Sequence, residues 1–281
     1  MDLHTIKEIV RPRARAQLPQ WTAGDAWLAG GTWLFSEPQP HLDRLVDLND
    51  LRWPALTVSD EGLDIAATCT IAQLDHLALN AGDTLPGPQW RALPLIGQCC
   101  RAFLASFKIW KAASVGGNLC MSLPAGPMIS LTSALDGICT IWAPDGSERR
   151  VAAVDFVTGP QRNVLMPGEL LRGILLPASA LARRTAFRQL SLAPHGRSAV
   201  LLIGTSGAGR PFTLTVTAST TKPVQLAFDD WPSADALRER IARDIPLAQY
   251  HTDVHGARDW RRRMTLQLAD EIRAELAGDT A

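Results

Sequence analysis

Two glycine pairs constrain the fold of this chain more than any other sequence feature. Gly30-Gly31 lies in LAGGTWLF after an apolar run, and Gly116-Gly117 lies in SVGGNLC after a small hydroxyl residue and an apolar one. Because glycine has no Cβ, backbone amides in such a loop can approach another group closely. Two loops of this kind, facing each other across a cleft between subdomains, would form a concave anion site suited to a pyrophosphate. A plain turn explains either pair alone.

The remaining pattern predicts a mixed α and β chain. Short strands alternate with turns over the first 60 residues, and Thr70 is placed to cap a helix that begins at Ile71. A Pro-Asp-Gly hairpin follows around residues 138–151, and MPGELLRGILLP predicts a further strand. After about residue 180 the sequence changes to three strands with glycine-rich joints and two final helices.

The last helix carries an apolar stripe and a basic cluster. The stripe repeats every four residues and indicates a face docked on the sheet. The cluster is interpreted as a solvated face or a subunit contact. The stripe consists of Trp260, Met264, Leu268, Ile272 and Leu276, and the cluster of Arg261, Arg262 and Arg263.

Composition excludes several classes of protein. Lys+Arg and Asp+Glu both number 28, so the net charge is zero, which argues against a nucleic-acid binder. No apolar run is long enough to span a bilayer, and the first twenty residues do not resemble a secretory signal. The five cysteines have irregular spacing and suit a reducing compartment, so we expect the cytoplasm. No C-x-x-C occurs, so we expect no iron–sulfur cluster in this chain, and Cys99 and Cys100 to be buried thiols.

Five separated segments resemble one known family in the same order. LAGGTWLF, SVGGNLCMSLPAG, MPGELLRGILLP, GRSAVLLIG and DVHGARDWRRRM are similar to the FAD-binding medium subunit of molybdenum hydroxylases, the xanthine dehydrogenase and carbon monoxide dehydrogenase type. The resemblance implies an α+β fold, with a PCMH-type FAD-binding domain of two α/β subdomains followed by a C-terminal domain with a three-stranded antiparallel sheet and helices. The implied boundaries are 1–56, 57–178 and 179–281.

The resemblance also implies which residues contact FAD. The pyrophosphate would lie between the two glycine loops, and further contacts would come from the segments that follow them. From the first loop the implied residues are Ala29, Gly30, Gly31, Thr32, Trp33 and Leu34. From the second they are Ser114, Val115, Gly116, Gly117 and Asn118, with Ser122, Leu171 and Arg188 elsewhere. A surface charge on a strand edge is an equal interpretation of Arg188.

Some positions depart from the family pattern and keep an alternative open. Trp33 stands where the family has Asp or Asn, Trp110 and Lys111 replace Arg and Asn, and Pro127 replaces an aspartate near the flavin. A flavin-free structural or docking subunit of the same kind of complex is therefore the second hypothesis. A free-standing flavin oxidase is a third, but such an enzyme needs its own substrate pocket and base, for which no His or Tyr pattern is visible.

The leading hypothesis is an electron-transfer subunit. The resemblance implies a large partner subunit with molybdopterin and a small one with 2Fe–2S clusters, as a dimer of heterotrimers. Electrons would reach FAD in this chain and pass to an external acceptor, so no catalytic acid or base is expected here. His251 and His255 are four apart, but Gly256 indicates a loop, so no metal site is expected.

Overall fold

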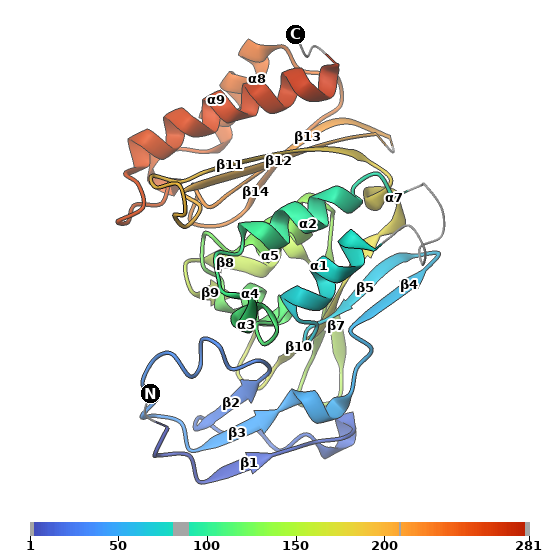
Figure 1. Ribbon diagram of the computed structural model, residues 1–281, viewed down its shortest axis with the longest axis vertical. Helices are drawn as coiled ribbons and strands as arrows, with labels where there is room; N and C mark the ends of the chain where they lie inside the picture. The colour runs from blue at the N-terminus through green and yellow to red at the C-terminus, as the bar shows by residue number, and fades with distance from the viewer. Residues whose placement is uncertain (1–2, 81–89, 208, 279–281) are drawn as a thin grey trace.

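The computed structural model describes residues 3–80, 90–207 and 209–278. The chain forms three units stacked along the long axis of the molecule, with the N-terminal unit at one end and the C-terminal unit at the other (Figure 1). The α+β class and the PCMH-type arrangement are confirmed. The boundaries at 56/57 and 178/179 stay predictions, although strand β4 starts at Leu56 and β11 at Arg184.

The N-terminal unit is a small parallel sheet in the order β1-β3-β2. Its central strand is fixed by an ion pair across the sheet: Arg44 Nη2 lies 2.6 Å from Asp25 Oδ2, and the two residues are register partners. Buried Leu45 and Val46 give β3 its apolar contacts. The strands are β1 (Glu8–Val10), β2 (Asp25–Leu28) and β3 (Arg44–Asp47), with 3-10 turns at Arg15–Gln17 and Leu48–Leu51.

The second unit is an antiparallel sheet with helices on one face. The sheet has the order β4-β5-β10-β6-β7. Its strands are β4 (Leu56–Ser59), β5 (Gly62–Ala66), β6 (Ile138–Trp142), β7 (Glu148–Ala152) and β10 (Leu170–Pro177), with a separate pair β8 (Val157–Gly159) and β9 (Arg162–Asn163). The helices are α1 (Ile71–Leu79), α2 (Leu93–Ala102), α3 (Phe107–Trp110), α4 (Val115–Met121), α5 (Pro127–Ala134), α6 (Ala153–Phe156) and α7 (Ala178–Leu181).

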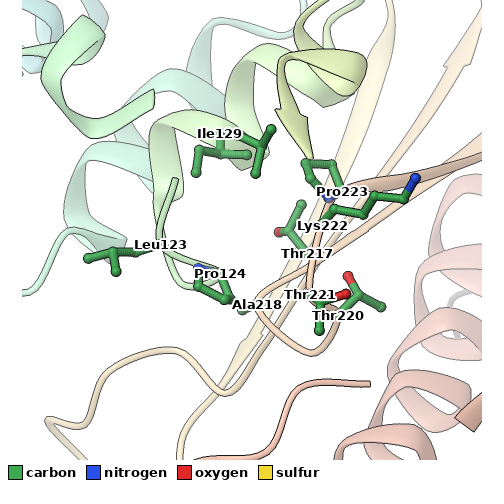
Figure 2. Close-up of a pocket in the computed structure, with 10 residues that line it drawn as sticks. Leu123, Pro124, Ile129, Thr217, Ala218, Thr220, Thr221, Lys222 and Pro223 are labelled. Atoms are coloured by element: carbon green, nitrogen blue, oxygen red, sulfur yellow. The ribbon is translucent and has the colours of Figure 1, made fainter. Parts of the chain in front are cut away.

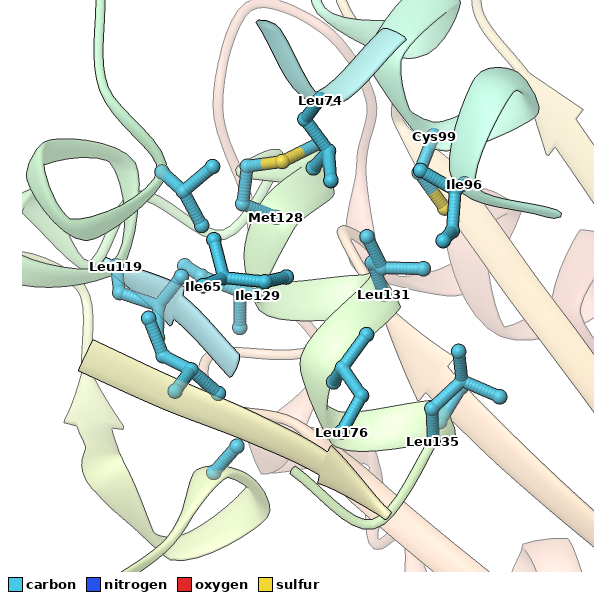
Figure 3. Close-up of a cluster of buried hydrophobic side chains, with 14 of the residues drawn as sticks. Ile65, Leu74, Ile96, Cys99, Leu119, Met128, Ile129, Leu131, Leu135 and Leu176 are labelled. Atoms are coloured by element: carbon cyan, nitrogen blue, oxygen red, sulfur yellow. The ribbon is translucent and has the colours of Figure 1, made fainter. Parts of the chain in front are cut away.

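The main hydrophobic core lies between this sheet and its helices. Figure 3 shows Ile65 of β5 and Leu176 of β10 beneath Leu74 of α1 and Met128 of α5. The free thiols are part of this packing, as predicted for Cys99 and Cys100, both of which are buried. Burial raises the pKa of Cys69 to about 12, so that thiol stays protonated.

The C-terminal unit corrects one prediction. In the described part of the chain its antiparallel sheet has four strands and not three, in the order β11-β12-β13-β14. The additional strand, VQLAF, follows Pro223 and pairs with β13 from Phe212 to Val216. The elements are β11 (Arg184–Leu190), β12 (Val200–Gly207), β13 (Arg210–Thr217), β14 (Val224–Phe228), α8 (Ala234–Asp244), a 3-10 turn at Leu247–Gln249 and α9 (Arg258–Ala277).

Strand β12 joins the second and C-terminal units because both of its faces are buried. Leu201 and Ile203 pack into the core of the second unit, whereas Val200 and Leu202 pack into a separate core under α8 and α9. Figure 1 shows this sheet between α8 and α9 on one side and α2 and α5 on the other. The recess where Leu123–Ile129 meets Thr217–Pro223 has no room for a water molecule and is a packing seam (Figure 2).

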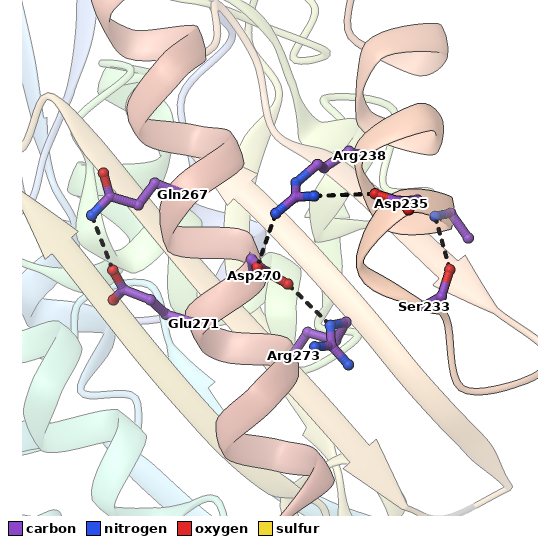
Figure 4. Close-up of polar contacts among 8 residues, drawn as sticks. Ser233, Asp235, Arg238, Gln267, Asp270, Glu271 and Arg273 are labelled. Atoms are coloured by element: carbon purple, nitrogen blue, oxygen red, sulfur yellow. Dashed lines mark hydrogen bonds and ion pairs between the residues drawn. The ribbon is translucent and has the colours of Figure 1, made fainter. Parts of the chain in front are cut away.

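Helix α9 docks on the sheet, as predicted, but its buried face is rotated from the predicted stripe. Leu268, Ile272 and Leu276 are buried, whereas Trp260 and Met264 are only partly so. Arg261, expected on a solvated face or in a subunit contact, is 1% exposed within the chain itself, which corrects that prediction. Arg262 and Arg263 are exposed. On the outer surface α8 and α9 are linked by charged side chains, with Arg238 between Asp235 and Asp270 (Figure 4).

Candidate functional site

The first glycine loop touches the chain immediately before the second. A Cβ on Gly30 would lie 1.7 Å from the carbonyl oxygen of Ala112 and 3.2 Å from the nitrogen of Ala113. Only glycine permits this backbone approach, because any side chain would collide with main-chain atoms. Since Ala113 directly precedes Ser114 in the sequence, the fold brings the two loops together.

The first loop presents unused backbone donors. Gly31 has a φ of +66°, and a Cβ there would lie 2.5 Å from the Phe35 ring. The turn closes through the amide of Phe35, which donates to the Gly31 carbonyl at 2.8 Å. Gly30, Thr32 and Leu34 make no hydrogen bond within the described residues, so their amides and the Thr32 hydroxyl are free to meet an anion. These residues fit a phosphate group.

The second loop differs because the protein itself uses its amides. Ser114 caps α4, its Oγ accepting from the Gly117 amide at 3.0 Å. Gly116 allows close packing, since a Cβ there would lie 2.5 Å from that of Ala67. The remaining amides donate as follows: Val115 to the Cys69 carbonyl at 2.8 Å, Gly116 to the Ala67 carbonyl at 3.0 Å and Asn118 to the Ser114 carbonyl at 3.0 Å.

The side chains that follow the second loop hold the next helix in place. Asn118 Oδ1 accepts from the Met128 amide at 3.1 Å, at the start of α5. Pro127 occupies the first turn of that helix and is buried. Ser122 is also buried, has a φ of +51° and donates through Oγ to the Leu119 carbonyl at 2.9 Å. These contacts therefore stabilise the chain between the second loop and α5.

Two other predicted contacts, Leu171 and Arg188, belong to strands and not to the glycine loops. Leu171 is a core residue of β10 with 2% exposure. Arg188 lies on the face of β11 that packs against α9, where its guanidinium pairs with Glu271 at 3.0 Å and Glu275 at 2.8 Å. The geometry therefore favours the surface-charge interpretation of Arg188.

The tryptophan departures have separate environments. Trp33 is half-buried in the turn of the first loop, where its carbonyl accepts from Ser36 Oγ at 2.7 Å. Trp110 ends α3, packs against the main core and donates through Nε1 to the Phe103 carbonyl at 3.1 Å. Of the two, only Trp33 lies in the loop with unused amides.

Glu169, in the Pro-Gly-Glu-Leu segment, was not singled out by the sequence. Its carboxylate forms a paired contact with Arg149, at 2.9 Å to Nε and 2.6 Å to Nη2, and accepts from the Met166 amide at 2.8 Å. The Arg149 hydrogen bond holds the pKa of Glu169 below its usual range despite burial. Its carbonyl accepts from Trp27 Nε1 at 2.9 Å, so Glu169 fastens the strand before the first glycine loop to the second unit.

A further polar cluster, where the sequence predicted no functional site, lines a cavity between the second and C-terminal units. It contains His251, Asp253 and the buried Arg261. Burial tends to raise the pKa of Asp253, but the His255 amide and the Arg261 guanidinium outweigh it and hold that pKa below its usual range. Within the described residues, no group of three or more His, Cys, Asp or Glu side chains is arranged to bind a metal ion.

Comparison with known proteins places this geometry in a family. The sequence profile described as "FAD binding domain in molybdopterin dehydrogenase" matches residues 6–179, more than half of the chain. The chain belongs to this family. The matched range contains both glycine loops and ends before the C-terminal sheet.

Relatives and solved structures agree with the family assignment. The chain is 27% identical over 194 residues to the carbon monoxide dehydrogenase medium chain of Afipia carboxidovorans, covering 67% of this chain and 64% of that one, slightly under two thirds of its length. The fold matches carbon monoxide dehydrogenase from Hydrogenophaga pseudoflava (TM-score 0.77, 19% identity, 98% and 99% coverage). It also matches quinoline 2-oxidoreductase from Pseudomonas putida 86 (TM-score 0.73, 17%, 98% and 97%). None of the described helices is both long and apolar enough to cross a membrane.

Proposed function

We propose that this chain is the FAD-binding electron-transfer subunit of a molybdopterin-containing hydroxylase or dehydrogenase complex in the cytoplasm. When bound, FAD would accept electrons from 2Fe–2S clusters on a small partner subunit and pass them to an external acceptor. A large partner subunit would hold molybdopterin and the substrate, in a dimer of heterotrimers. The family match and the similarity to a medium chain support this proposal.

The observation that carries the proposal is the first glycine loop. Gly30 is pressed against Ala112, which fixes the loop without using its amides. The free amides of Gly30, Thr32 and Leu34 and the Thr32 hydroxyl then supply the donors that a pyrophosphate needs. Ala29, Gly31 and Trp33 would border the group. The chain's part in the reaction is to position the cofactor and exclude competing contacts.

The second loop would contact FAD through side chains and open surface more than through backbone amides. The amides of Val115, Gly116, Gly117 and Asn118 are occupied by protein acceptors. The Ser114 hydroxyl already accepts from Gly117, so its own hydrogen remains available to donate. Among the described residues, a Cβ on Gly117 would meet only Ser114 Oγ within 4 Å, which leaves the outer side of this glycine open to a ligand.

The occupied amides are also the observation that favours the second candidate, a flavin-free docking subunit. In that case the glycines of the second loop serve packing alone, as Gly116 does against Ala67. Trp33 would then fill space beside the first loop. The two candidates differ in one measurable property, the presence of FAD in the assembled complex.

The experiment is to express the chain together with the subunits encoded by neighbouring reading frames and to purify the complex. Flavin absorbance and mass spectrometry of the released cofactor then report its identity and amount. The proposal expects one FAD for each copy of this chain. A complete complex that contains molybdenum and iron but no flavin would contradict it and support the docking subunit.

A further inference from the structure

A cavity of about 190 Å³ lies between the second and C-terminal units, and no residue of the first glycine loop lines it. One wall is apolar and comes from Leu123, Pro124 and Pro160. The opposite wall is polar and comes from the C-terminal unit. Its members are Arg197, Ser198, His251, Asp253 and Arg261, and Gln161, Ala125 and Ala218 complete the lining.

The backbone around this cavity is held in unusual conformations. Gln161 and Ala218 have φ angles of +55° and +60°, which side chains other than glycine rarely adopt. Both residues are hydrogen-bonded to the segment between α4 and α5. The Gln161 amide donates to the Ser122 carbonyl, and the Ala218 amide donates to the Pro124 carbonyl, both at 2.9 Å. Such strain persists where the surrounding structure enforces it and concentrates at functional sites.

The charges on the polar wall leave one cation unmatched. Arg261 is fully used, donating through Nη1 to the carbonyls of Ala199 at 2.6 Å and Ala218 at 2.7 Å and pairing with Asp253. Asp253 therefore has its counter-ion. Arg197 is exposed and forms no hydrogen bond or ion pair with any described residue.

Ser198 and His251 line the cavity together with that cation. Ser198 is buried, and its Oγ accepts from Gln189 Nε2 at 2.9 Å, so its own hydrogen is available to the cavity. His251 Nε2 lies 3.4 Å from Asp253 Oδ2, and the imidazole is 22% exposed. The charged groups that act on His251 are Asp253 and Arg261, and Arg197 lines the same cavity.

We propose that this cavity binds a small organic carboxylate. The carboxylate would pair with Arg197 and accept a hydrogen bond from Ser198 and, when the imidazole is protonated, one from the ring nitrogen of His251 that does not face Asp253. The apolar body would lie against Leu123, Pro124 and Pro160. The cavity is smaller than the roughly 300–1,000 Å³ of drug-sized sites, so the ligand has about the size of one ring. The site is independent of the function proposed above, because none of its lining residues belongs to a glycine loop.

Titration calorimetry of the full chain with three probes tests the ligand class. Benzoate has both the charge and the apolar body, benzyl alcohol has only the body, and inorganic phosphate has only the charge. The proposal expects benzoate to bind at least about tenfold more tightly than either, since each wall contributes. Equal affinity for phosphate, or no saturable binding of benzoate, overturns it.

Variants test the named residues. Arg197→Ala should weaken benzoate binding about tenfold or more, because it removes the charge-assisted contact. Arg263→Ala removes another exposed arginine, on α9 and outside the cavity, and should leave the affinity unchanged. Since Arg197 is exposed and pairs with no residue that the structure describes, its loss should not alter thermal unfolding. Equal weakening by both variants would show a general charge effect and overturn the site.

The pKa of His251 provides a further test, because ligand binding should change it and a purely structural role of the cavity should not. Burial lowers the pKa of His251 below its usual value, with Asp253 opposing and Arg261 reinforcing the shift. A bound carboxylate should raise that pKa, measured from the ring proton by NMR with and without benzoate. An unchanged titration at saturating benzoate overturns the proposal, as does displacement of benzoate by FAD, which would place the cavity within the cofactor's own site.

Discussion

At the scale of single residues, the two glycines of the first loop serve different physical needs. Gly30 is required by the approach of the Ala112 carbonyl, and Gly31 by its left-handed conformation beside Phe35. Both needs are internal to the protein, yet together they leave the loop amides unused. Gly117 is less constrained than either, since a Cβ there would contact only the Ser114 hydroxyl, at 2.9 Å, in the part of the chain that the structure describes.

Gly30→Ala should therefore disrupt the cofactor loop. The new methyl group would overlap the Ala112 carbonyl, which forces the two loops apart at a cost of about 1–3 kcal/mol. We expect FAD content, measured by flavin absorbance of the purified complex, to fall well below that of the parent. Gly146→Ala is the control, because Gly146 has a φ of +87° but open space around it. Full FAD occupancy in Gly30→Ala would contradict the expectation.

Glu169→Gln should remove an acid-sensitive part of the stability. The folded-state pKa of Glu169 is held below its usual value near 4.5 by Arg149, so its contribution is complete above that value. It is lost as the pH falls below about 4.5 through the lower folded-state pKa. At pH 7 the variant should lose about 1–3 kcal/mol of the free energy of unfolding in urea.

The difference between parent and Glu169→Gln should shrink as the pH falls below about 4.5 and through the lower folded-state pKa of Glu169, because the parent carboxylate is then also protonated. Glu37→Gln, at an exposed position outside the described contacts of Glu169, is the matched control and should follow the parent at every pH. A difference that stays constant with pH would show that the effect comes from shape and not from charge.

At the scale of elements, local signals in the sequence predicted most of the structure. Thr70 and Gln73 form the capping box of α1, and the 138–151 hairpin follows its Pro-Asp-Gly turn. The predicted buried face of α9 was wrong in part because a local sequence pattern cannot tell which of three adjacent arginines is buried. Arg261 shares its face with Thr265, Leu268 and Ile272, and its charge is satisfied by carbonyls distant in sequence, which no local pattern shows.

The candidate site could be predicted only in part for the same reason. The chemistry of the Gly30–Gly31 loop follows from residue types alone, because a bare backbone is a local property. The use of the second loop's amides depends on Cys69 and Ala67, which precede it by more than forty positions in the sequence, and the pairing of Arg188 depends on α9. The edge strand β14 was missed because it is short and begins directly after a proline.

Thr70→Ala tests the element whose boundary the sequence defined most clearly. Thr70 Oγ1 accepts from the Gln73 amide at 3.2 Å, and Gln73 Oε1 accepts from the Thr70 amide at 2.9 Å. Loss of the hydroxyl leaves a first-turn amide without its acceptor and should lower the free energy of unfolding by about 1 kcal/mol. Thr70→Ser keeps the hydroxyl and should stay close to the parent in the same denaturant titration. Equal losses in both variants would rule out the cap as the cause.

At the scale of the whole molecule, the C-terminal unit is held to the second unit by a polar seam as well as by β12. Ser130 Oγ lies 2.6 Å from Thr217 Oγ1 across the seam. The hydroxyls of Ser133, Thr205, Thr213 and Thr215 are buried and find no partner among the described protein atoms. Because such groups oppose burial, strong contacts elsewhere in the seam must hold the two units together.

Asp136 supplies those contacts from a single position. Its carboxylate lies 2.7 Å from Arg183 Nη2 and 3.1 Å from Arg210 Nη1, and accepts from Gln225 Nε2 at 3.1 Å. Arg183 is 4% exposed, so its charge depends on this partner. One residue of the second unit therefore ties together β13, β14 and the chain just before β11.

Asp136→Asn should loosen the C-terminal unit selectively. Asparagine tolerates the φ of +50° at this position and keeps one acceptor oxygen, so the variant removes mainly the charge. Leaving Arg183 without its counter-ion should lower the free energy of unfolding by about 3 kcal/mol. Hydrogen exchange should then show faster exchange in β11–β14 than in the parent while the core between α1, α2 and β5 keeps its protection. Asp235→Asn, which breaks the exposed pair with Arg238, should change neither measurement, whereas uniform loss of protection in both units would mean that they unfold as one body and that Asp136 does not set their coupling.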